Sequence, residues 1–423
     1  MTRKLQKPNK QWLRYGAFFF AFAVLYNFIV INHFKLWQAD NVTYTYHLVD
    51  YSFGFATKFL PGALYHLFFK EVLVGQLNVY LTVLTLLLFA FAAFMLAKLV
   101  CAQTDAAGRK VLLVLSLFFL SGPCTFSVFT YELGMLDEYW LFFSALFLVC
   151  LARKYIRFFI PFLFVASLLV HFSSVLSYIA FFAILLLYHI ASAAKKSERV
   201  GLWIIFALSL AVTAVLGIYL ITKEQSALKY SLEEFNQQLD ARNRSFDETY
   251  YVYFDYSVYK HYEQGALSYA KVMSEPLLTQ GGFFAQMVNT VYWQLKTISQ
   301  FYAQIPGVRL QLLLLVLLCV PLYALFVKYW VKKIKVGTAL QKFTYFLCIA
   351  QFPFTALIGT LFSPDVPRWM THAFLIQFTL FLYIVYREKD GDKIGALLPS
   401  FVGSREVLLY YLIYAITFFD PYT

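Results

Sequence analysis

The chain alternates between long apolar runs and short connectors that carry most of its charged residues. Several runs hold about 20 apolar residues, and at ~1.5 Å per residue such a helix crosses a hydrocarbon core of roughly 30 Å. The pattern therefore predicts membrane-spanning α-helices joined by short loops. The expected spans are 15–34, 77–99, a run that ends near 129, 133–152, 158–190, 201–222, a run that starts near 309, 343–362, 369–386 and 405–419.

Composition agrees with this pattern. Of the 423 residues, 61% are hydrophobic, 20% are aromatic and only 14% are charged, which is too little charge to cover a soluble protein of this size. We predict one all-α, polytopic membrane domain over residues 1–423, with 10 or 11 transmembrane helices. The five cysteines are widely spaced in or beside apolar runs, so neither a disulfide framework nor a metal site is predicted.

The basic residues set the expected orientation. A net charge of +12 suggests nucleic acid in a soluble chain, but here Lys and Arg fall mostly in short loops between apolar runs. This is the distribution that orients membrane helices, so no nucleic-acid partner is expected. The basic N-terminus is placed in the cytoplasm, and the run after it lacks a cleavage site and is interpreted as a retained helix. Residues 223–307 then form one large extracytoplasmic loop.

The apolar stretch 158–190 allows two interpretations. A single straight helix would be about 50 Å long and would put Arg157 and Lys195 on opposite sides of the membrane. A hairpin of two short helices keeps both basic clusters inside, with VHFSS (170–174) at its outer apex. The positive charges favour the hairpin.

The first outer loop contains HLVDYSFGFATKFLPG, a charged pair set among aromatic residues. Asp50 and Lys58 are candidate functional residues in this stretch. Residues 61–72 predict a short amphipathic helix in the membrane interface, with His66 and Lys70 as an i,i+4 pair. The alternative for Asp50 and Lys58 is a salt bridge that only fixes the loop.

The second outer loop contains YELGMLDEYW. The apolar run after it is too short to span unless its helix begins near Leu133, which brings Asp137 about one turn inside the outer boundary. An ionisable group at that depth costs several kcal/mol unless it faces water or a partner, so Asp137 and Glu138 are functional candidates. The alternative is that both carboxylates lie in the headgroup layer and match the helix dipole.

Two further outer segments carry candidates. In SPDVPRW, Asp365, Arg368 and Trp369 are candidate substrate-binding residues at the start of a predicted helix, where an arginine adds two-point phosphate recognition to the helix N-terminus. The alternative is an interfacial anchor formed by Arg368 and Trp369. His171, at the apex of the hairpin, is a substrate-binding candidate, although a buried histidine hydrogen-bonded to a neighbouring helix is the more common case.

This arrangement resembles membrane glycosyltransferases of the GT-C type, which have many helices, an acidic residue in the first outer loop and further acids in the second. Asp50 matches the position of the first acid, and Asp137 with Glu138 resembles the second acidic site. The spaced segments DYSFGF…K, LDEY, VH and D-x-x-RW also resemble bacterial membrane proteins of surface-polysaccharide synthesis.

The resemblance implies a glycosyltransferase or polysaccharide polymerase that takes a sugar on a polyprenyl phosphate or diphosphate at the outer leaflet. Asp50, or Asp137 as second choice, would be the general base, and Arg368 with Lys58 would stabilise the departing phosphate. The implied location is the bacterial cytoplasmic membrane. The implied partners are membrane lipid, the lipid-linked glycan and other enzymes of envelope-glycan assembly; a divalent metal has no support in the sequence.

Other classes of function remain open from the sequence. A transporter or flippase of lipid-linked glycans is the main alternative, although transporters usually place coupling residues near the midplane in two related halves. A non-catalytic scaffold and an acyl or phosphoethanolamine transferase are the others. No P-loop, GxSxG, HExxH or paired CxxC motif occurs, which disfavours a nucleotide-driven pump and the hydrolases of those families.

Overall fold

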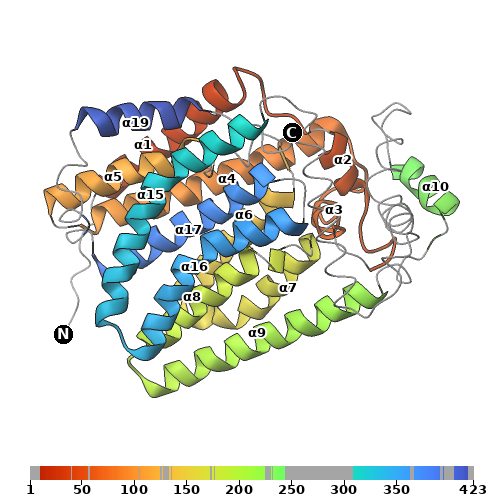
Figure 1. Cartoon of the computed structure of the whole chain (residues 1–423). Coiled ribbons are helices and arrows are strands. Elements are labelled where there is room, and N and C mark those ends of the chain that lie inside the picture. Colours follow the sequence, from red (N-terminus) through yellow and green to blue (C-terminus); the bar gives the residue numbers. More distant parts are fainter. Residues whose placement is uncertain are drawn as a thin grey trace, which may run out of the picture.

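The computed structural model of the chain is a bundle of helices that pack side by side (Figure 1). It describes residues 10–39, 41–55, 58–103, 105–123, 126, 133–134, 136–171, 174–175, 177–223, 230, 232–242, 308–362, 366–390, 394 and 404–417. These residues form α-helices with short π- and 3₁₀-helical segments and contain no β-strand. The all-α fold class predicted from the sequence is therefore confirmed.

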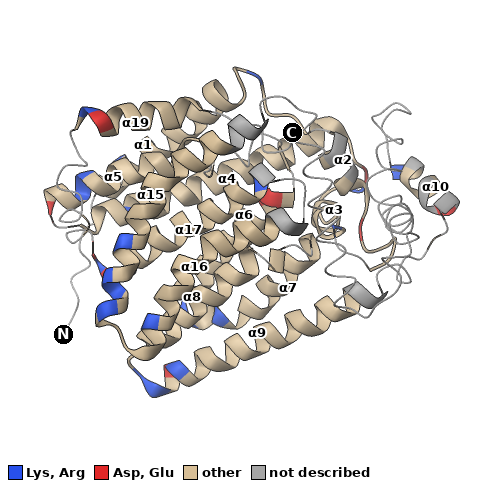
Figure 2. Cartoon of the chain, viewed as in Figure 1, with Lys and Arg blue, Asp and Glu red and all other residues tan. Residues whose placement is uncertain are grey.

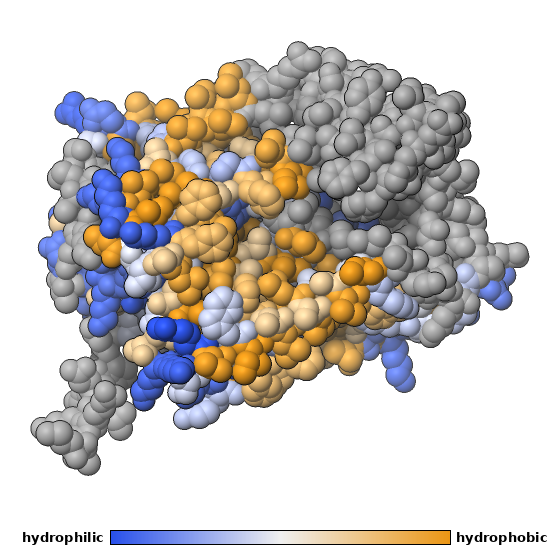
Figure 3. All heavy atoms as spheres, turned by 60° about the horizontal axis from the view of Figure 1, so that its bottom comes forward, coloured by the Kyte–Doolittle hydropathy of each residue, from blue (hydrophilic) through white to orange (hydrophobic). Residues whose placement is uncertain are grey.

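Within the described residues, six helices are long and apolar enough to cross a membrane. They are α1 (Lys10–Tyr26) with its π-helical extension η1 (Asn27–Ile31), α4 (Val74–Cys101), α9 (Lys196–Lys223), α15 (Val308–Val336), α16 (Ala339–Phe362) and α17 (Val366–Glu388). On the face seen in Figure 3, apolar side chains cover most of the described surface between the basic end and the grey part, as lipid contact requires. The chain is thus a multi-pass membrane protein.

The remaining apolar helices are shorter. They are α5 (Ala106–Leu120), α6 (Leu136–Ala152), α7 (Ile160–Val170), α8 (Tyr178–Ser192) and α19 (Arg405–Ile416). At 11 to 17 residues each is shorter than the ~20 residues of a full crossing. The number of 10 or 11 crossings therefore stays a prediction, while the multi-pass class does not depend on it.

The hairpin expected within 158–190 is present. Helix α7 ends at Val170, α8 begins at Tyr178, and the chain reverses between them. The Nη1 of Arg157, before α7, lies 2.7 Å from the Oε1 of Glu198, after α8, so both basic clusters lie at one end of the bundle. Pro161 in the first turn of α7 suits this start, since a proline there sacrifices no helical hydrogen bond.

The same end of the bundle collects most of the basic side chains (Figure 2). There Lys333 of α15 forms ion pairs with Glu388, at the end of α17, and with Asp390, just after it. Tyr345 of α16 donates its hydroxyl to Glu388 at 2.6 Å. This cluster ties α15, α16 and α17 together at the basic end of the bundle, and the described functional candidates lie toward the other end.

The segment between η1 and α4, predicted to be the first outer loop and called by that name below, differs from the expected single interfacial helix over 61–72. It contains α2 (Asn41–Leu48), which the sequence pattern did not predict, and α3 (Leu60–His66), which ends well before residue 72. Hydrogen bonds from Tyr65 to the Glu71 carbonyl and from Tyr44 to the Val72 carbonyl hold the following segment out of the helix. His66 and Lys70 are therefore not an i,i+4 pair on one helix.

A glycine fixes how α2 and α3 meet. A Cβ added at Gly62 would lie 1.7 Å from the carbonyl oxygen of Val49 and 2.9 Å from that of Tyr46. Only glycine permits this close approach of two backbones. The short segment LPG thus positions the first outer loop against the bundle. The predicted extracytoplasmic loop over 223–307 contains α10 (Leu232–Arg242), and residues 243–307 lie outside the described part of the chain.

Candidate functional site

A buried ion pair joins two of the predicted site residues. Arg368, in the first turn of α17, donates from Nε and Nη2 to the two carboxylate oxygens of Asp137, each at 2.9 Å. Asp137 lies in the first turn of α6 and is fully buried, whereas 21% of the Arg368 side chain is exposed. This two-point geometry orients the guanidinium as well as neutralising the carboxylate. An oriented, partly exposed guanidinium is suited to recognition of a carboxylate or phosphate.

A histidine and a tyrosine extend this pair. The Nε2 of His372 lies 3.0 Å from Oδ1 of Asp137, and its Nδ1 lies 2.9 Å from the hydroxyl of Tyr178 at the start of α8. Because a carboxylate oxygen only accepts, this contact favours the tautomer with hydrogen on Nε2 and a lone pair on Nδ1. Tyr178 then donates to His372. In the row Tyr178–His372–Asp137, the carboxylate of Asp137 orients His372, and His372 accepts a hydrogen bond from Tyr178 as a base accepts from a polar group.

Two tryptophans pack around the row. The ring of Trp140 in α6 lies 5.2 Å from that of Tyr178 and 5.5 Å from that of His372, and its Nε1 donates to the Ser167 carbonyl at 3.0 Å. The ring of Trp369 lies 5.9 Å from that of His372. These aromatic groups exclude water, which strengthens the electrostatic interactions inside. We call Asp137, Arg368, His372 and Tyr178 the α6–α17 cluster.

An apolar cavity of about 100 Å³ begins one turn deeper in the membrane, between α4, α5, α6 and α17. On α6 it is lined by residues spaced four, seven and eleven positions after Asp137, and on α17 by residues seven, eleven and fifteen positions after Arg368. These spacings place the lining residues on the same helix faces as the cluster. They include Leu141, Ser144 and Leu148 of α6 and Leu375, Thr379 and Tyr383 of α17. The α6–α17 cluster itself does not line the cavity; the first lining residues on its helix faces are Leu141, about one turn after Asp137, and Leu375, about two turns after Arg368.

Glu138 faces the other way from its neighbour Asp137. It is fully buried and accepts hydrogen bonds from the hydroxyl of Thr85 in α4 at 2.8 Å and from the backbone N–H of Gly134 at 3.0 Å. Next to it, the Tyr139 hydroxyl lies 2.6 Å from Nε2 of the buried His47 in α2. Glu138 and Tyr139 thus anchor α6 to α4 and to the first outer loop, on the side away from Arg368.

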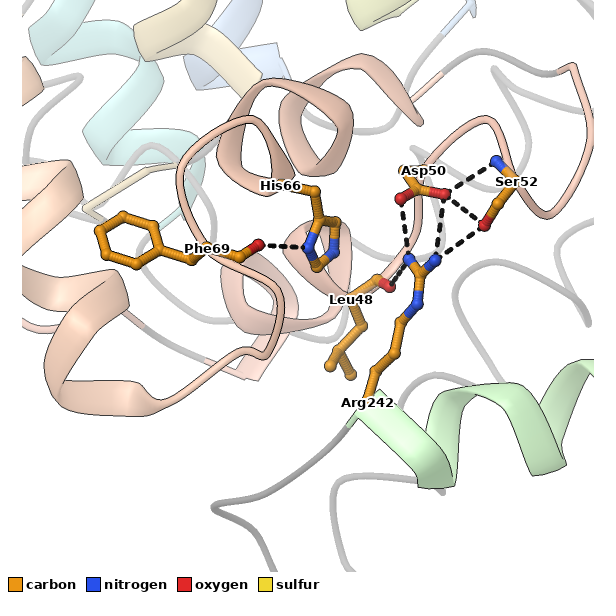
Figure 4. Close-up of polar contacts among 6 residues, drawn as sticks. All are labelled: Leu48, Asp50, Ser52, His66, Phe69 and Arg242. Carbon is orange, nitrogen blue, oxygen red and sulfur yellow. Dashed lines mark hydrogen bonds and ion pairs between the residues drawn. The ribbon is translucent and has the colours of Figure 1, made fainter.

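Asp50 belongs to a second cluster, in the first outer loop (Figure 4). It pairs with Arg242 of α10 at 3.0 Å, and its other oxygen accepts from the backbone N–H and the hydroxyl of Ser52. Burial alone would raise the pKa of Asp50, but the hydrogen bonds from Ser52 and the charge of Arg242 together hold that pKa below its ordinary value. Among the described residues, the ion pair of Asp50 is made with Arg242 and not with Lys58.

The other predicted residues lie as follows. Lys58 places its ammonium 5.8 Å from the ring centre of Tyr46 and, with a φ of 69°, donates its backbone N–H to Leu169 of α7. His171 directly follows α7, with its ring 6.2 Å from that of Trp140. Asp365 lies outside the described residues.

The structure therefore divides the predicted site residues between two clusters. Asp137, Arg368, Trp369 and His171 gather around α6 and α17, whereas Asp50 belongs to the first outer loop with Arg242. No hydrogen bond or ion pair between described residues joins Asp50 to Asp137. Nor does the described part of the chain contain a group of three or more His, Cys, Asp or Glu side chains placed to hold a metal ion.

The sequence analysis did not single out His372, Tyr178, Trp140 or Arg242 as site residues. One signal was readable, because His372 follows Arg368 by four positions and so shares its helix face. The other three residues come from elements that meet only in the folded chain. No family model, curated protein or solved structure matches this chain, so a function can be inferred only from its own residues.

Proposed function

We propose that the chain is an integral membrane glycosyltransferase or polysaccharide polymerase that acts at the outer leaflet on a polyprenyl phosphate- or diphosphate-linked sugar. One observation carries the proposal: the α6–α17 cluster, with its partly exposed Arg368, lies at the start of two helices whose same faces line an apolar cavity further along. A lipid-linked sugar has the same division, with a phosphate at the junction of a polar head and a hydrocarbon chain. The cavity would bind the first part of the lipid's hydrocarbon chain.

The residues of the cluster have distinct roles in this reaction. An acceptor hydroxyl attacks the anomeric carbon, the bond from that carbon to the lipid phosphate breaks, and the phosphate leaves with the bonding electrons and takes up the proton that the hydroxyl loses. Arg368, held by Asp137, offsets the charge that develops on the phosphate. Asp137 acts by orienting Arg368 and His372, because a carboxylate already bound by a guanidinium is a weak base. A single displacement inverts the configuration at the anomeric carbon.

The setting of the enzyme is part of the proposal. The basic end of the bundle would face the cytoplasm, together with the N-terminus, and the α6–α17 cluster would face the outer leaflet of a bacterial cytoplasmic membrane. Partners would be membrane lipid, the lipid-linked glycan and other enzymes of envelope-glycan assembly. The first outer loop, with Asp50, would lie on the glycan side.

The experiment is complementation of a deletion strain at equal protein levels. Arg368→Ala and Asp137→Asn are expected to abolish the surface glycan and to raise the pool of lipid-linked sugar, measured by mass spectrometry of extracted lipids. Arg368→Lys keeps the charge but loses the two-point geometry, and we expect it to retain a small part of the activity. Lys70→Ala, on an exposed residue, is the matched control. Wild-type glycan and lipid pools in both Arg368→Ala and Asp137→Asn would exclude the proposal.

A flippase of lipid-linked glycans is the second candidate, and one observation favours it. Gln351 of α16 and Gln377 of α17 lie eleven residues from the facing ends of these two consecutive helices, so they lie at similar depth near the middle of the membrane. Both are buried, and both amide atoms of Gln377 have no hydrogen-bond partner among the described residues. The two functions differ in where the lipid-linked sugar accumulates in the deletion strain: in the outer leaflet for a transferase, in the inner leaflet for a flippase.

A further inference from the structure

Arg242, at the end of α10, makes several polar contacts with the first outer loop (Figure 4). Its guanidinium donates to the Leu48 carbonyl at 3.1 Å and to the Ser52 hydroxyl at 2.8 Å, and it pairs with Asp50 at 3.0 Å. It also lies 4.7 Å from the ring centre of the buried Phe53. One flat, multi-donor group is thus stacked on an aromatic ring and bonded to oxygen atoms of three residues.

His66, the last residue of α3, has an unused acceptor. Its Nδ1 is 3.0 Å from the Phe69 carbonyl, and a carbonyl oxygen only accepts, so Nδ1 carries the hydrogen. In the neutral ring Nε2 then holds a lone pair. That atom is buried and has no hydrogen-bond partner among the described residues. Figure 4 shows the Nε2 edge of the ring turned toward the Arg242 guanidinium, which contributes no hydrogen bond to it.

An unmet acceptor at this place is informative. A buried acceptor without a donor costs roughly 1–3 kcal/mol, and such groups in native proteins call for an explanation. If Arg242 moves away, the Leu48 carbonyl and the Asp50 carboxylate lose its donors and the face of Phe53 loses its cation, while the His66 Nε2 remains an unbonded acceptor on the side that faces Arg242 in Figure 4. Several O–H donors around an apolar ring face match this set, and that is the chemistry of a sugar on an aromatic platform.

We propose that Leu48, Asp50, Phe53 and His66 form a second binding subsite, for a polyhydroxylated ligand, and that Arg242 covers it in this structure. Under the proposed function, on which this assignment of the ligand rests, the ligand is the glycan that accepts the transferred sugar. His66 is a positioning residue that accepts a hydrogen bond from a ligand hydroxyl. Arg242, at the end of α10, links occupancy of the subsite to the position of that helix.

The first test measures access to the His66 lone pair with diethylpyrocarbonate, which reacts with unprotonated imidazole nitrogen, followed by peptide mass spectrometry of the full chain in detergent. Arg242→Ala is expected to speed modification of His66 about tenfold, equivalent to roughly 1.4 kcal/mol of lost closure. His47, with both nitrogens bonded and full burial, is the unreactive internal control, and the exposed His33 is the reactive one. Equal rates of His66 modification in wild type and Arg242→Ala would overturn the proposal that Arg242 covers the subsite.

The second test asks what the subsite takes. In Arg242→Ala, oligosaccharide released from the host's own surface glycan by mild acid is expected to slow modification of His66 and not of His33. Poly(ethylene glycol) at the same mass concentration, which has hardly any hydroxyl groups, is expected to have no effect. Equal protection of His66 and His33 by the oligosaccharide would overturn the subsite.

The third test separates positioning from a structural role. His66→Asn keeps a donor for the Phe69 carbonyl but removes the acceptor, whereas His66→Gln places an amide near the lost Nε2. Glycan synthesis in the complemented strain is expected to fall in His66→Asn and to be partly rescued in His66→Gln; equal loss in both would show a structural role only. Since the labelling tests do not depend on transfer, intact glycan in Arg368→Ala with His66 still protected would remove the proposed function and leave the subsite.

Discussion

At the scale of single residues, the main result is that both candidate acids are already engaged. Asp137 is bound by Arg368 and contacts His372, and Asp50 is bound by Arg242. A buried carboxylate held by a guanidinium depends on that partner, because an unpaired buried charge is strongly unfavourable. In this structure both carboxylates are therefore placed to orient cations.

The Asp137–Arg368 pair makes a prediction for stability. Arg368→Ala leaves the Asp137 carboxylate buried without its cation and is expected to lower the free energy of unfolding by roughly 3–5 kcal/mol. Adding Asp137→Asn to that variant removes the stranded charge, so the double variant should unfold less easily than Arg368→Ala alone. Unfolding in detergent, followed by tryptophan fluorescence, measures all three variants. Simple addition of the two single effects would contradict this coupling.

Asp50 makes a prediction for pH. The pKa of Asp50 is lower in the folded chain than its ordinary value of ~3.9. The stability that its contact with Arg242 contributes is therefore fully present above ~3.9 and is lost as the pH falls through the folded pKa. Hydrogen exchange of the peptide around Ser52, whose N–H donates to Asp50, should therefore accelerate at acid pH after correction for intrinsic rates. Asp50→Asn is the control and should show no such step. A step of the same size in Asp50→Asn would assign it to another group.

The sequence predicted residue chemistry better than residue pairing. Asp137 and Arg368 stood out because charged groups near a hydrocarbon core require a partner, but 231 positions separate them and no pattern tied one to the other. For Asp50, the sequence suggested a salt bridge with Lys58, because both lie in the same short stretch. Its actual partner, Arg242, lies 192 positions away, a separation at which the sequence pattern gives no information about contact.

At the scale of elements, the local sequence pattern predicts the long helices, whereas tertiary contacts determine the short helices α2 and α3. Long apolar helices follow from composition alone, since a run of ~20 apolar residues has one stable form in lipid. Helix α2 was missed because its residues, NVTYTYHL, combine β-branched and aromatic side chains that favour strands. Its stability comes from burial, which also shortens α3 through the contacts of Tyr44 and Tyr65.

The approach of α16 to α17 makes a prediction at this scale. A Cβ at Gly359 would lie 2.4 Å from Cγ of Trp369, next to Arg368, so Gly359→Ala must displace that ring or the helix. We expect a loss of about 1–3 kcal/mol in stability, together with weaker glycan synthesis. Gly201→Ala in α9 is the matched control, because no atom lies within 4 Å of its added Cβ. It should be neutral or stabilising by up to ~1 kcal/mol, and equal loss in both variants would contradict the packing argument.

At the scale of the whole molecule, the distribution of charge predicts orientation. Leu36 lies beyond the outer end of η1 with 78% exposure, and Tyr155 lies beyond the inner end of α6 with 89% exposure. In a variant without native cysteines, Leu36→Cys is expected to react with a membrane-impermeant maleimide on intact cells, whereas Tyr155→Cys should react only after the membrane is opened. Labelling of Tyr155→Cys alone in intact cells would invert the topology.

The cavity makes the last prediction, which concerns the link between the membrane and the α6–α17 cluster. Ala145 lines the cavity on α6, and the adjacent Leu146 is 37% exposed and points to lipid. Ala145→Phe adds a ring to the cavity and is expected to reduce the polyprenyl phosphate that co-purifies with the chain, as measured by native mass spectrometry, and to reduce glycan synthesis with it. Leu146→Phe adds the same ring at the lipid face and should change neither.

The comparison of these neighbouring positions separates lipid binding from stability. Thermal unfolding in detergent identifies any loss caused by overpacking, which is about 1–3 kcal/mol where a core has no spare room. Retention of bound lipid in Ala145→Phe, with Arg368→Ala still inactive, would place the hydrocarbon chain elsewhere and leave the charged cluster without its apolar partner. Loss of lipid in Ala145→Phe alone would make the cavity the path by which a lipid phosphate reaches Arg368.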